Sequence, residues 1–134
     1  MKSVKKRAFT LIEMLLVLVI LAALAALVVP RFTGRSEQAR VTAAKVQISA
    51  IATALKSFET NVGRFPTESE GLGALVHQPG NASGWLGPYL EKQVPLDPWD
   101  NPYIYRHPAR IGIDFDVLST GPDGLEGTED DIVN

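Results

Sequence analysis

The chain has 134 residues, of which 46% are hydrophobic, and its formal net charge at neutral pH is −2. This length allows a single domain, and the near-neutral charge excludes a strongly basic nucleic-acid-binding protein. The chain contains no cysteine, which excludes disulfide frameworks, cysteine nucleophiles, thiolate metal sites and lipid anchors on cysteine. The two histidines, His77 and His107, are too few for a histidine-rich metal site.

The charges are distributed unevenly along the chain. Residues 1–8 contain four basic residues and no acidic residue, whereas residues 114–134 contain seven acidic residues and no lysine or arginine. The chain therefore has a basic start and an acidic end, and each end carries a candidate functional site.

Residues 9–29 form an apolar run in which Glu13 is the single charged residue. As a helix this run is about 32 Å long, which matches the hydrocarbon core of a bilayer at about 30 Å. Because the basic residues precede the run, we expect the N-terminus in the cytoplasm and everything after Pro30 across the membrane. A secretory signal peptide cleaved at Ala23-Leu24-Ala25 is the alternative.

Glu13 is the least expected residue of this run. An ionised side chain at bilayer depth costs about 2.5–3.5 kcal/mol on insertion scales, so an acid there indicates a functional role. Residues 8–30 contain no lysine, arginine or histidine that could pair with Glu13. Cleavage before Phe9 would create an α-ammonium group four residues away, which is a partner for Glu13 in the same chain or in a neighbour.

The segment from Lys5 to Glu13 resembles the leader junction of type IV pilins and type II secretion pseudopilins. This resemblance implies that a membrane peptidase cleaves between Ala8 and Phe9 on the cytoplasmic side and then N-methylates Phe9. It also implies that Glu13 is required for subunits to join a filament. Ala8 stands where the family usually has glycine.

An apolar stripe follows Gly34 and predicts a helix that continues to Val62. Its residues are separated alternately by three and four positions, as on one face of a helix; they are Val41, Ala44, Ile48, Ile51, Leu55, Phe58 and Val62. We interpret the stripe as core-facing, with a coiled coil against a separate partner as the alternative. Gly63 is expected to end the helix, so residues 9–62 form one long helix that is interrupted near Pro30.

Residues 63–134 are expected to form a small, loop-rich head. A short helix is predicted between Glu68 and His77, with Leu72 and Leu75 facing inward. A strand is predicted at residues 103–105, and a second one at residues 113–117, where apolar residues alternate with Asp114 and Asp116. We expect these strands to pair in an antiparallel sheet packed against the helix, which gives an α+β fold.

Aromatic and apolar side chains supply the bulk of this head; they are Trp85, Tyr89, Leu90, Trp99 and Tyr103. We interpret them as core and loop anchors, with a ligand-stacking platform as the alternative. No basic patch accompanies them, so nucleic acid is not an expected partner.

A turn-rich acidic segment ends the chain. Residues 119–124 are typical of turns, and five acidic residues fall within residues 123–131. Calcium, which takes six to eight oxygen ligands in a flexible geometry, would offset their mutual repulsion. The spacing is not that of an EF-hand, and a solvated acidic terminus explains the same residues equally well.

From Lys5 to its end the chain resembles the major, G-type pseudopilin of type II secretion systems. The segments that carry this resemblance are Leu118–Gly124, Gly127–Ile132, Arg64–Thr67 with Gly71-Leu72, Asp97–Trp99 and Asn101–Tyr103. The resemblance implies a pilin-like α+β fold, in which a long N-terminal helix, transmembrane in its first half, packs on a small antiparallel sheet. It also implies that the C-terminal loop binds Ca²⁺ through the side chains of Asp123, Asp130 and Asp131 and the main-chain carbonyl of Thr120.

The same resemblance implies how the chain is organised and what it does. Residues 1–8 would be a cleaved cytoplasmic leader, residues 9–29 a transmembrane segment that later lies in a filament core, and residues 30–134 a periplasmic head. The chain would be a structural subunit and not an enzyme. It would polymerise with itself and with minor pseudopilins into the periplasmic pseudopilus, which drives export of folded proteins across the outer membrane.

Further partners implied are the prepilin peptidase, the inner-membrane assembly platform of the secretion system, and membrane lipid before assembly. A major pilin of a type IV pilus and a secreted calcium-binding domain behind a cleavable signal are the alternatives.

Overall fold

The computed structural model describes the backbone of residues 8–134 and the side chains of residues 8–27 and 36–134. Apart from Ala8, the predicted leader lies outside these residues, as do the side chains of the last two residues of the predicted span. The chain divides into two compact units, Met1–Gln38 and Ala39–Asn134.

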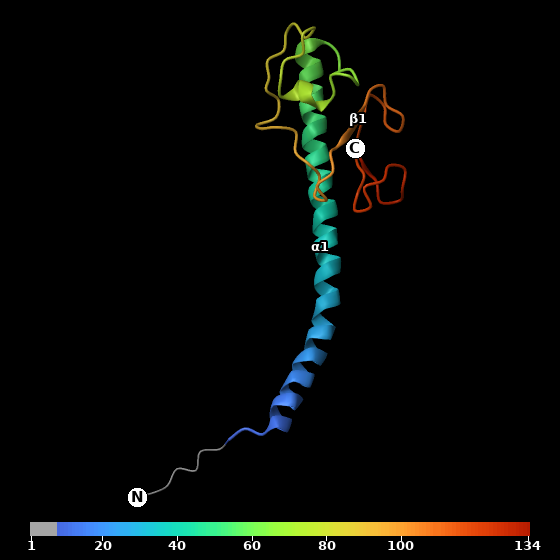
Figure 1. The fold of residues 1–134 in the computed structure, drawn as a ribbon. Coiled ribbons are helices and arrows are strands. Elements are labelled where there is room, and N and C mark those ends of the chain that lie inside the picture. Colours follow the sequence, from blue (N-terminus) through green and yellow to red (C-terminus); the bar gives the residue numbers. More distant parts are fainter. Residues whose placement is uncertain (1–7) are drawn as a thin grey trace, which may run out of the picture. The chain divides into compact units, whose positions relative to one another are not determined.

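Five elements follow one another along the chain (Figure 1). They are helix α1 (Leu11–Val62), the 3₁₀-helix η1 (Leu72–Leu75), and strands β1 (Ile104–Arg106), β2 (Asp116–Ser119) and β3 (Ile132–Val133). The α+β class expected from the sequence is confirmed. The predicted short helix after Glu68 is confirmed as η1, with Leu72 and Leu75 both buried.

The apolar stripe of α1 forms the centre of the core in the second unit. Its middle residues Ala44, Ile48, Ile51, Leu55 and Phe58 are at most 2% exposed, and its two end residues are partly buried against the same core. The core-facing interpretation of the stripe is therefore confirmed. The helix ends where expected, because Gly63 adopts a φ of 83° and its N–H donates to the carbonyl of Glu59 at 2.7 Å.

The strands form one antiparallel sheet in the order β1-β2-β3. In the register, Ile104 pairs with Leu118 and Arg106 with Asp116, and Leu118 also pairs with Val133. The predicted pairing of the two longer strands is confirmed, shifted by one to three residues toward the C-terminus. Strand β3 was not predicted, because two residues carry no recognisable alternation.

The predicted facing of residues 113–117 is wrong at two positions. Ile113, expected inward, is 97% exposed, and Asp116, expected outward, is fully buried. The strand begins only at Asp116, and the preceding residues form a loop whose backbone N–H groups need an acceptor. The Asp116 carboxylate is that acceptor for Arg110, Ile111 and Gly112, at 2.6, 3.0 and 2.7 Å.

The aromatic residues act as anchors, as expected. Tyr103 belongs to the buried core, and Trp85, Tyr89 and Trp99 pack against it. The Trp85 indole donates to the carbonyl of Ala74 at 2.9 Å, and the rings of Trp85 and Tyr89 meet edge to face with centroids 5.8 Å apart. These bonds fix the loops around η1.

Candidate functional site

The predicted cleavage position lies in the exposed, non-helical segment that precedes α1. Ala8, Phe9 and Thr10 are all exposed, Phe9 to 80%. An exposed segment without helical hydrogen bonds is the kind of backbone that a peptidase can bind in its cleft. The cleavage itself stays a prediction.

Glu13 holds the start of the helix in the uncut chain. Its carboxylate accepts hydrogen bonds from the N–H of Thr10 at 2.7 Å and from the Thr10 hydroxyl at 3.1 Å. The Glu13 N–H lies 3.3 Å from the Thr10 hydroxyl oxygen. This is a capping box, and its signal is the spacing in the sequence, a threonine followed three residues later by a glutamate. The proposed assembly residue therefore already has hydrogen-bond donors in its own chain.

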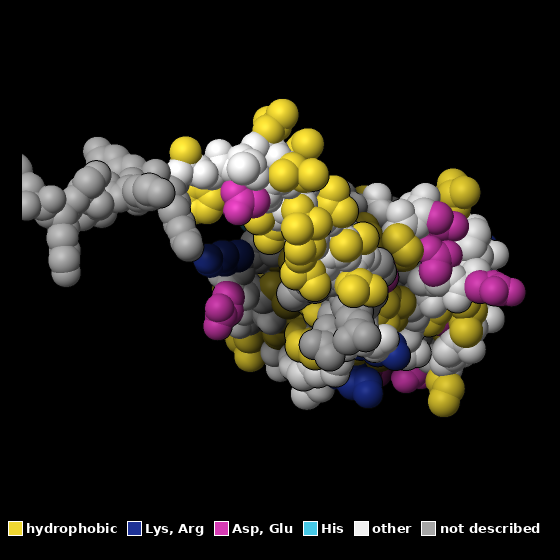
Figure 2. All heavy atoms as spheres, turned by 90° about the horizontal axis from the view of Figure 1, so that it is seen from below, with side chains coloured by type: hydrophobic (Ala, Val, Ile, Leu, Met, Phe, Trp, Pro, Cys, Tyr) yellow, Lys and Arg dark blue, Asp and Glu magenta, His cyan; other side chains and the backbone are white. Residues whose placement is uncertain are grey.

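The first unit exposes a long apolar surface. Every side chain described from Ala8 to Leu27 is exposed, and Figure 2 shows hydrophobic side chains gathered along this end of α1. A continuous apolar surface of this kind marks contact with a partner or a membrane. Within the residues that the structure describes, no helix satisfies both the length and the apolarity needed to cross a membrane.

The C-terminal acidic loop joins β2 to β3 and is closed by hydrogen bonds among its own residues. Asp130 accepts from the Thr128 hydroxyl at 2.6 Å and from the Asp123 N–H at 3.3 Å. The Thr128 hydroxyl is the main cause of a lowered pKa at Asp130. Gly121 packs so closely that a Cβ there would lie 2.6 Å from the Asp130 carbonyl oxygen. The loop thus brings Asp123, Asp130 and the residue after Thr120 together.

Among the residues that the structure describes, one buried carboxylate oxygen of this loop has no hydrogen-bond partner. Asp131 accepts from the Gly127 N–H at 2.7 Å through Oδ2, whereas its Oδ1 is buried without any hydrogen bond. A buried, unpaired carboxylate oxygen requires an explanation, and a cation with oxygen ligands is one that fits its chemistry. Among the residues described here, however, no three acidic or histidine side chains converge closely enough to surround a metal.

Glu126 is committed to another contact. It forms an ion pair with Arg106 of β1, and the carboxylate is the main cause of a raised pKa at that arginine. This pair ties the acidic loop to the sheet.

A buried carboxylate that sequence reasoning missed anchors the start of the acidic loop. Asp97 is 3% exposed and accepts from the Ser119 hydroxyl at 2.6 Å and from the Asn101 N–H at 2.8 Å. Ser119 in turn accepts from the Gly121 N–H at 3.2 Å, and the Asn101 side chain donates to the Gly121 carbonyl at 3.4 Å. Asp97 therefore holds the backbone next to Thr120 through two intermediaries.

Comparison with known families agrees with this architecture. Residues 31–134 match the model of the family described as type II secretion system protein G, and residues 4–29 match the prokaryotic N-terminal methylation motif. The chain belongs to the protein G family of type II secretion systems. Members of this family are structural pseudopilins.

Individual relatives of the protein G family cover nearly the whole chain. The type II secretion system core protein G of Pseudomonas aeruginosa is 45% identical, over 97% of this chain and 93% of its own length. The corresponding protein of Escherichia coli K12 is 40% identical, over 97% of this chain and 91% of its own. The crystal structure of the major pseudopilin from the type 2 secretion system of enterohaemorrhagic Escherichia coli has a TM-score of 0.68 and 32% identity, covering 80% of this chain and 96% of that one.

Proposed function

We propose that this chain is the major pseudopilin subunit that polymerises into the periplasmic pseudopilus of a type II secretion system. The observation that carries the proposal is the match over nearly the full chain to proteins named type II secretion system core protein G. In this role the filament drives export of folded proteins across the outer membrane. The further partners are minor pseudopilins, the prepilin peptidase and the assembly platform of the inner membrane.

The N-terminal segment is proposed to anchor the subunit before assembly. Residues 9–29 of the sequence carry a single charge and follow a basic cluster, which favours a single membrane pass with a cytoplasmic N-terminus and a periplasmic head. A subunit can leave the bilayer only if other apolar helices replace the lipid around it. The exposed apolar side chains of this segment are therefore proposed to form the filament core.

Glu13 is proposed to guide each subunit into the filament. Removal of residues 1–8 would leave an α-ammonium group on Phe9, which remains positively charged after N-methylation, and a carboxylate in a low-dielectric core is stabilised by such a charge. The hydrogen bonds from Thr10 pre-orient the carboxylate at the start of α1. An incoming subunit then places its ammonium against a carboxylate that is already fixed in position.

The acidic loop is proposed to bind one calcium ion. Asp123, Asp130 and Asp131 would supply side-chain oxygens and Thr120 its main-chain carbonyl, and the unpaired Oδ1 of Asp131 supports this set. When bound, the ion would offset the negative charges of the loop and would join its two ends through the oxygen ligands. The bonds around Gly121 hold the backbone beside Thr120, and the three aspartates would have to move closer together to surround the ion, since they do not converge in this structure. A small head domain without disulfides gains stability from a bound metal ion of this kind.

The decisive test combines the mature N-terminus with the filament. The full chain is expressed in a bacterium with a type II secretion system that lacks its own major pseudopilin. Intact mass spectrometry is expected to show a chain that begins at a methylated Phe9, and electron microscopy is expected to show filaments in sheared fractions. A chain that keeps residues 1–8 in the presence of the peptidase, or that begins near Ala26, would overturn the proposal.

A further inference from the structure

The loop between β1 and β2 presents two exposed isoleucines at its tip. Ile113 is 97% exposed and Ile111 is 67% exposed, whereas the apolar residues of the sheet are buried or half-buried. Single exposed apolar residues are common on protein surfaces, so exposure alone carries no conclusion. The way in which this tip is held distinguishes it.

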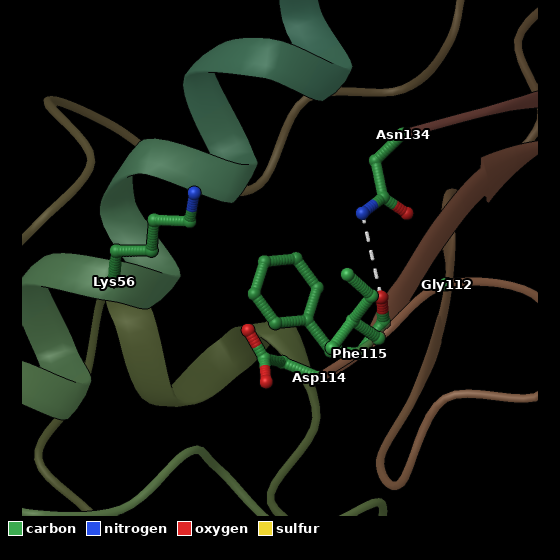
Figure 3. A pocket seen from close by; sticks show the side chains of 6 residues that line it. Lys56, Gly112, Asp114, Phe115 and Asn134 are labelled. Carbon is green, nitrogen blue, oxygen red and sulfur yellow. Dashed lines mark hydrogen bonds between the residues drawn. The ribbon is translucent and has the colours of Figure 1, made fainter.

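Residues 110–113, here called the isoleucine tip, are braced by a fully buried charge. The carboxylate of Asp116 accepts the N–H groups of three consecutive tip residues, with distances of 2.6–3.0 Å. At the base of the loop, Phe115 points toward α1 and its carbonyl accepts from Asn134 at 3.3 Å (Figure 3). The tip is thus fixed before it meets any partner, which lowers the entropy lost on docking.

The same unit also carries an apolar hollow of about 310 Å³, here called the tyrosine hollow. Its lining residues are Glu68, Gly71, Leu72, Val94, Pro95, Leu96, Pro102, Tyr103 and Tyr105. The hydroxyl of Tyr105 donates to the Pro66 carbonyl at 2.8 Å, and the hydroxyl of Tyr103 donates to Gln47. The phenol groups are therefore satisfied inside the head, and their rings are left as fixed walls. A cavity of about 150 Å³ suffices for a benzene-sized group, so the hollow has room for a branched side chain.

Tip and hollow also carry opposite charges. Arg110 is exposed at the start of the tip, and the exposed Glu68 lines the hollow. Two acidic residues lie near the tip. The carboxylate of Asp116 is taken up by the three tip N–H groups, and Asp114 lies at the base of the loop, where it lines a different hollow together with Lys56 and Ile113 (Figure 3). The isoleucine tip with its exposed Arg110 is thus opposite in charge to the apolar tyrosine hollow with its exposed Glu68.

From this match we propose that the isoleucine tip of one subunit docks into the tyrosine hollow of the next subunit in the filament. The inference rests on the proposed function as a filament subunit. A second copy is the partner because every copy offers both halves of the contact on the same head. A contact between two different surfaces of the same protein can repeat without closing, as an open helical filament requires.

Disulfide crosslinking in assembled filaments tests the contact directly, because the chain has no cysteine of its own. Full-length Ile113→Cys and Leu96→Cys chains are produced together in cells that assemble filaments, and then oxidised. We expect a crosslinked dimer when both chains are present and none with either chain alone. Filaments without this dimer, or an equal dimer from Ile113→Cys alone, would overturn the inference. A parent chain that forms no filaments would overturn the proposed function and, with it, this contact.

A charge exchange and an apolar deletion provide a second measurement. Arg110→Glu and Glu68→Arg are each expected to reduce the filament yield, and the two changes in one chain are expected to restore it. Ile113→Ser is expected to weaken the contact on the order of 10- to 100-fold, the effect of losing one buried isoleucine. Leu125→Ser is the matched control, since Leu125 is 64% exposed on another loop. Equal yields from both serine variants, or a double exchange no better than either single one, would contradict the proposal.

Discussion

The buried carboxylate of Asp116 offers the sharpest test of how the head is stabilised. Hydrogen bonds to a charged group contribute about 1.5–3 kcal/mol each, and Asp116 accepts three of them. Water can replace part of this loss, because Arg110, Ile111 and Gly112 are themselves exposed, and removing the charge also removes its own desolvation. We therefore expect Asp116→Ala to lower the free energy of unfolding by about 2–4 kcal/mol.

The change is measured by thermal unfolding of a fragment that begins after Gly34. A loss of this size corresponds to a fall in Tm of about 10–25 °C for a domain of about 100 residues. Asp114→Asn is the matched control, because the neighbouring Asp114 is exposed, and its Tm should stay close to that of the parent. A Tm of Asp116→Ala within a few degrees of the control would refute the account of the brace.

The pH dependence of the same pair of proteins gives a second check. Burial disfavours the charged form of Asp116, but the three N–H groups together outweigh it, so the pKa of this carboxyl lies below its ordinary value. A lowered pKa in the folded state adds stability that is present above the unfolded pKa of about 3.9 and is lost as the pH falls through the folded pKa. The gap in Tm between parent and Asp116→Ala should therefore narrow as the pH falls below about 4. A gap that stays constant down to the acid transition would contradict this reasoning.

Four further predictions concern the two ends of the chain and the loop after α1. Glu13→Leu should insert into the membrane as well as the parent but form few filaments, scored by shearing and immunoblotting; normal filaments would contradict the pairing with an ammonium group. Calcium at a hundredfold excess over its Kd should stabilise the head by about 2.7 kcal/mol and so raise its Tm above the value measured with chelator. Asp123→Ala should abolish most of this gain, and equal Tm values with calcium and chelator would favour a solvated terminus. Gly121→Ala should lower the Tm more than Gly127→Ala, because both positions have positive φ but only at Gly121 does a Cβ meet a backbone oxygen, at 2.6 Å. The hydrogen bond from Arg64 is the main cause of the fall in the pKa of Glu70 to about 2. The stabilisation that this ion pair provides should therefore be complete above about pH 4.3 and disappear as the pH falls toward 2. Glu70→Gln should lack this stabilisation at any pH.

The parts of the fold that follow from local pattern could be predicted. The stripe from Val41 to Val62 determines which face of α1 is buried, because side-chain periodicity and burial coincide in a helix. The end at Gly63 follows from its tolerance of positive φ. Both depend on residues that are close together in the sequence.

The buried carboxylates could not be predicted in this way. Asp116 and Asp97 each satisfy backbone N–H groups of a loop, and a fully buried carboxylate needs partners that the tertiary structure alone brings together. The alternation around Asp116 therefore predicts a strand that begins three residues too early. The capping box at Thr10 and Glu13 is different, because its spacing is local and was available in the sequence.

The short outer strands of the sheet have a consequence for a crowded filament. β1 has three residues and β3 has two, so each edge of the sheet offers little unpaired backbone. Long free edges are templates for strand addition and for cross-β aggregation when many copies lie at high local concentration. Heads with such short edges can pack side by side without strand pairing between their backbones. Side-chain contacts then determine which surfaces of neighbouring heads meet.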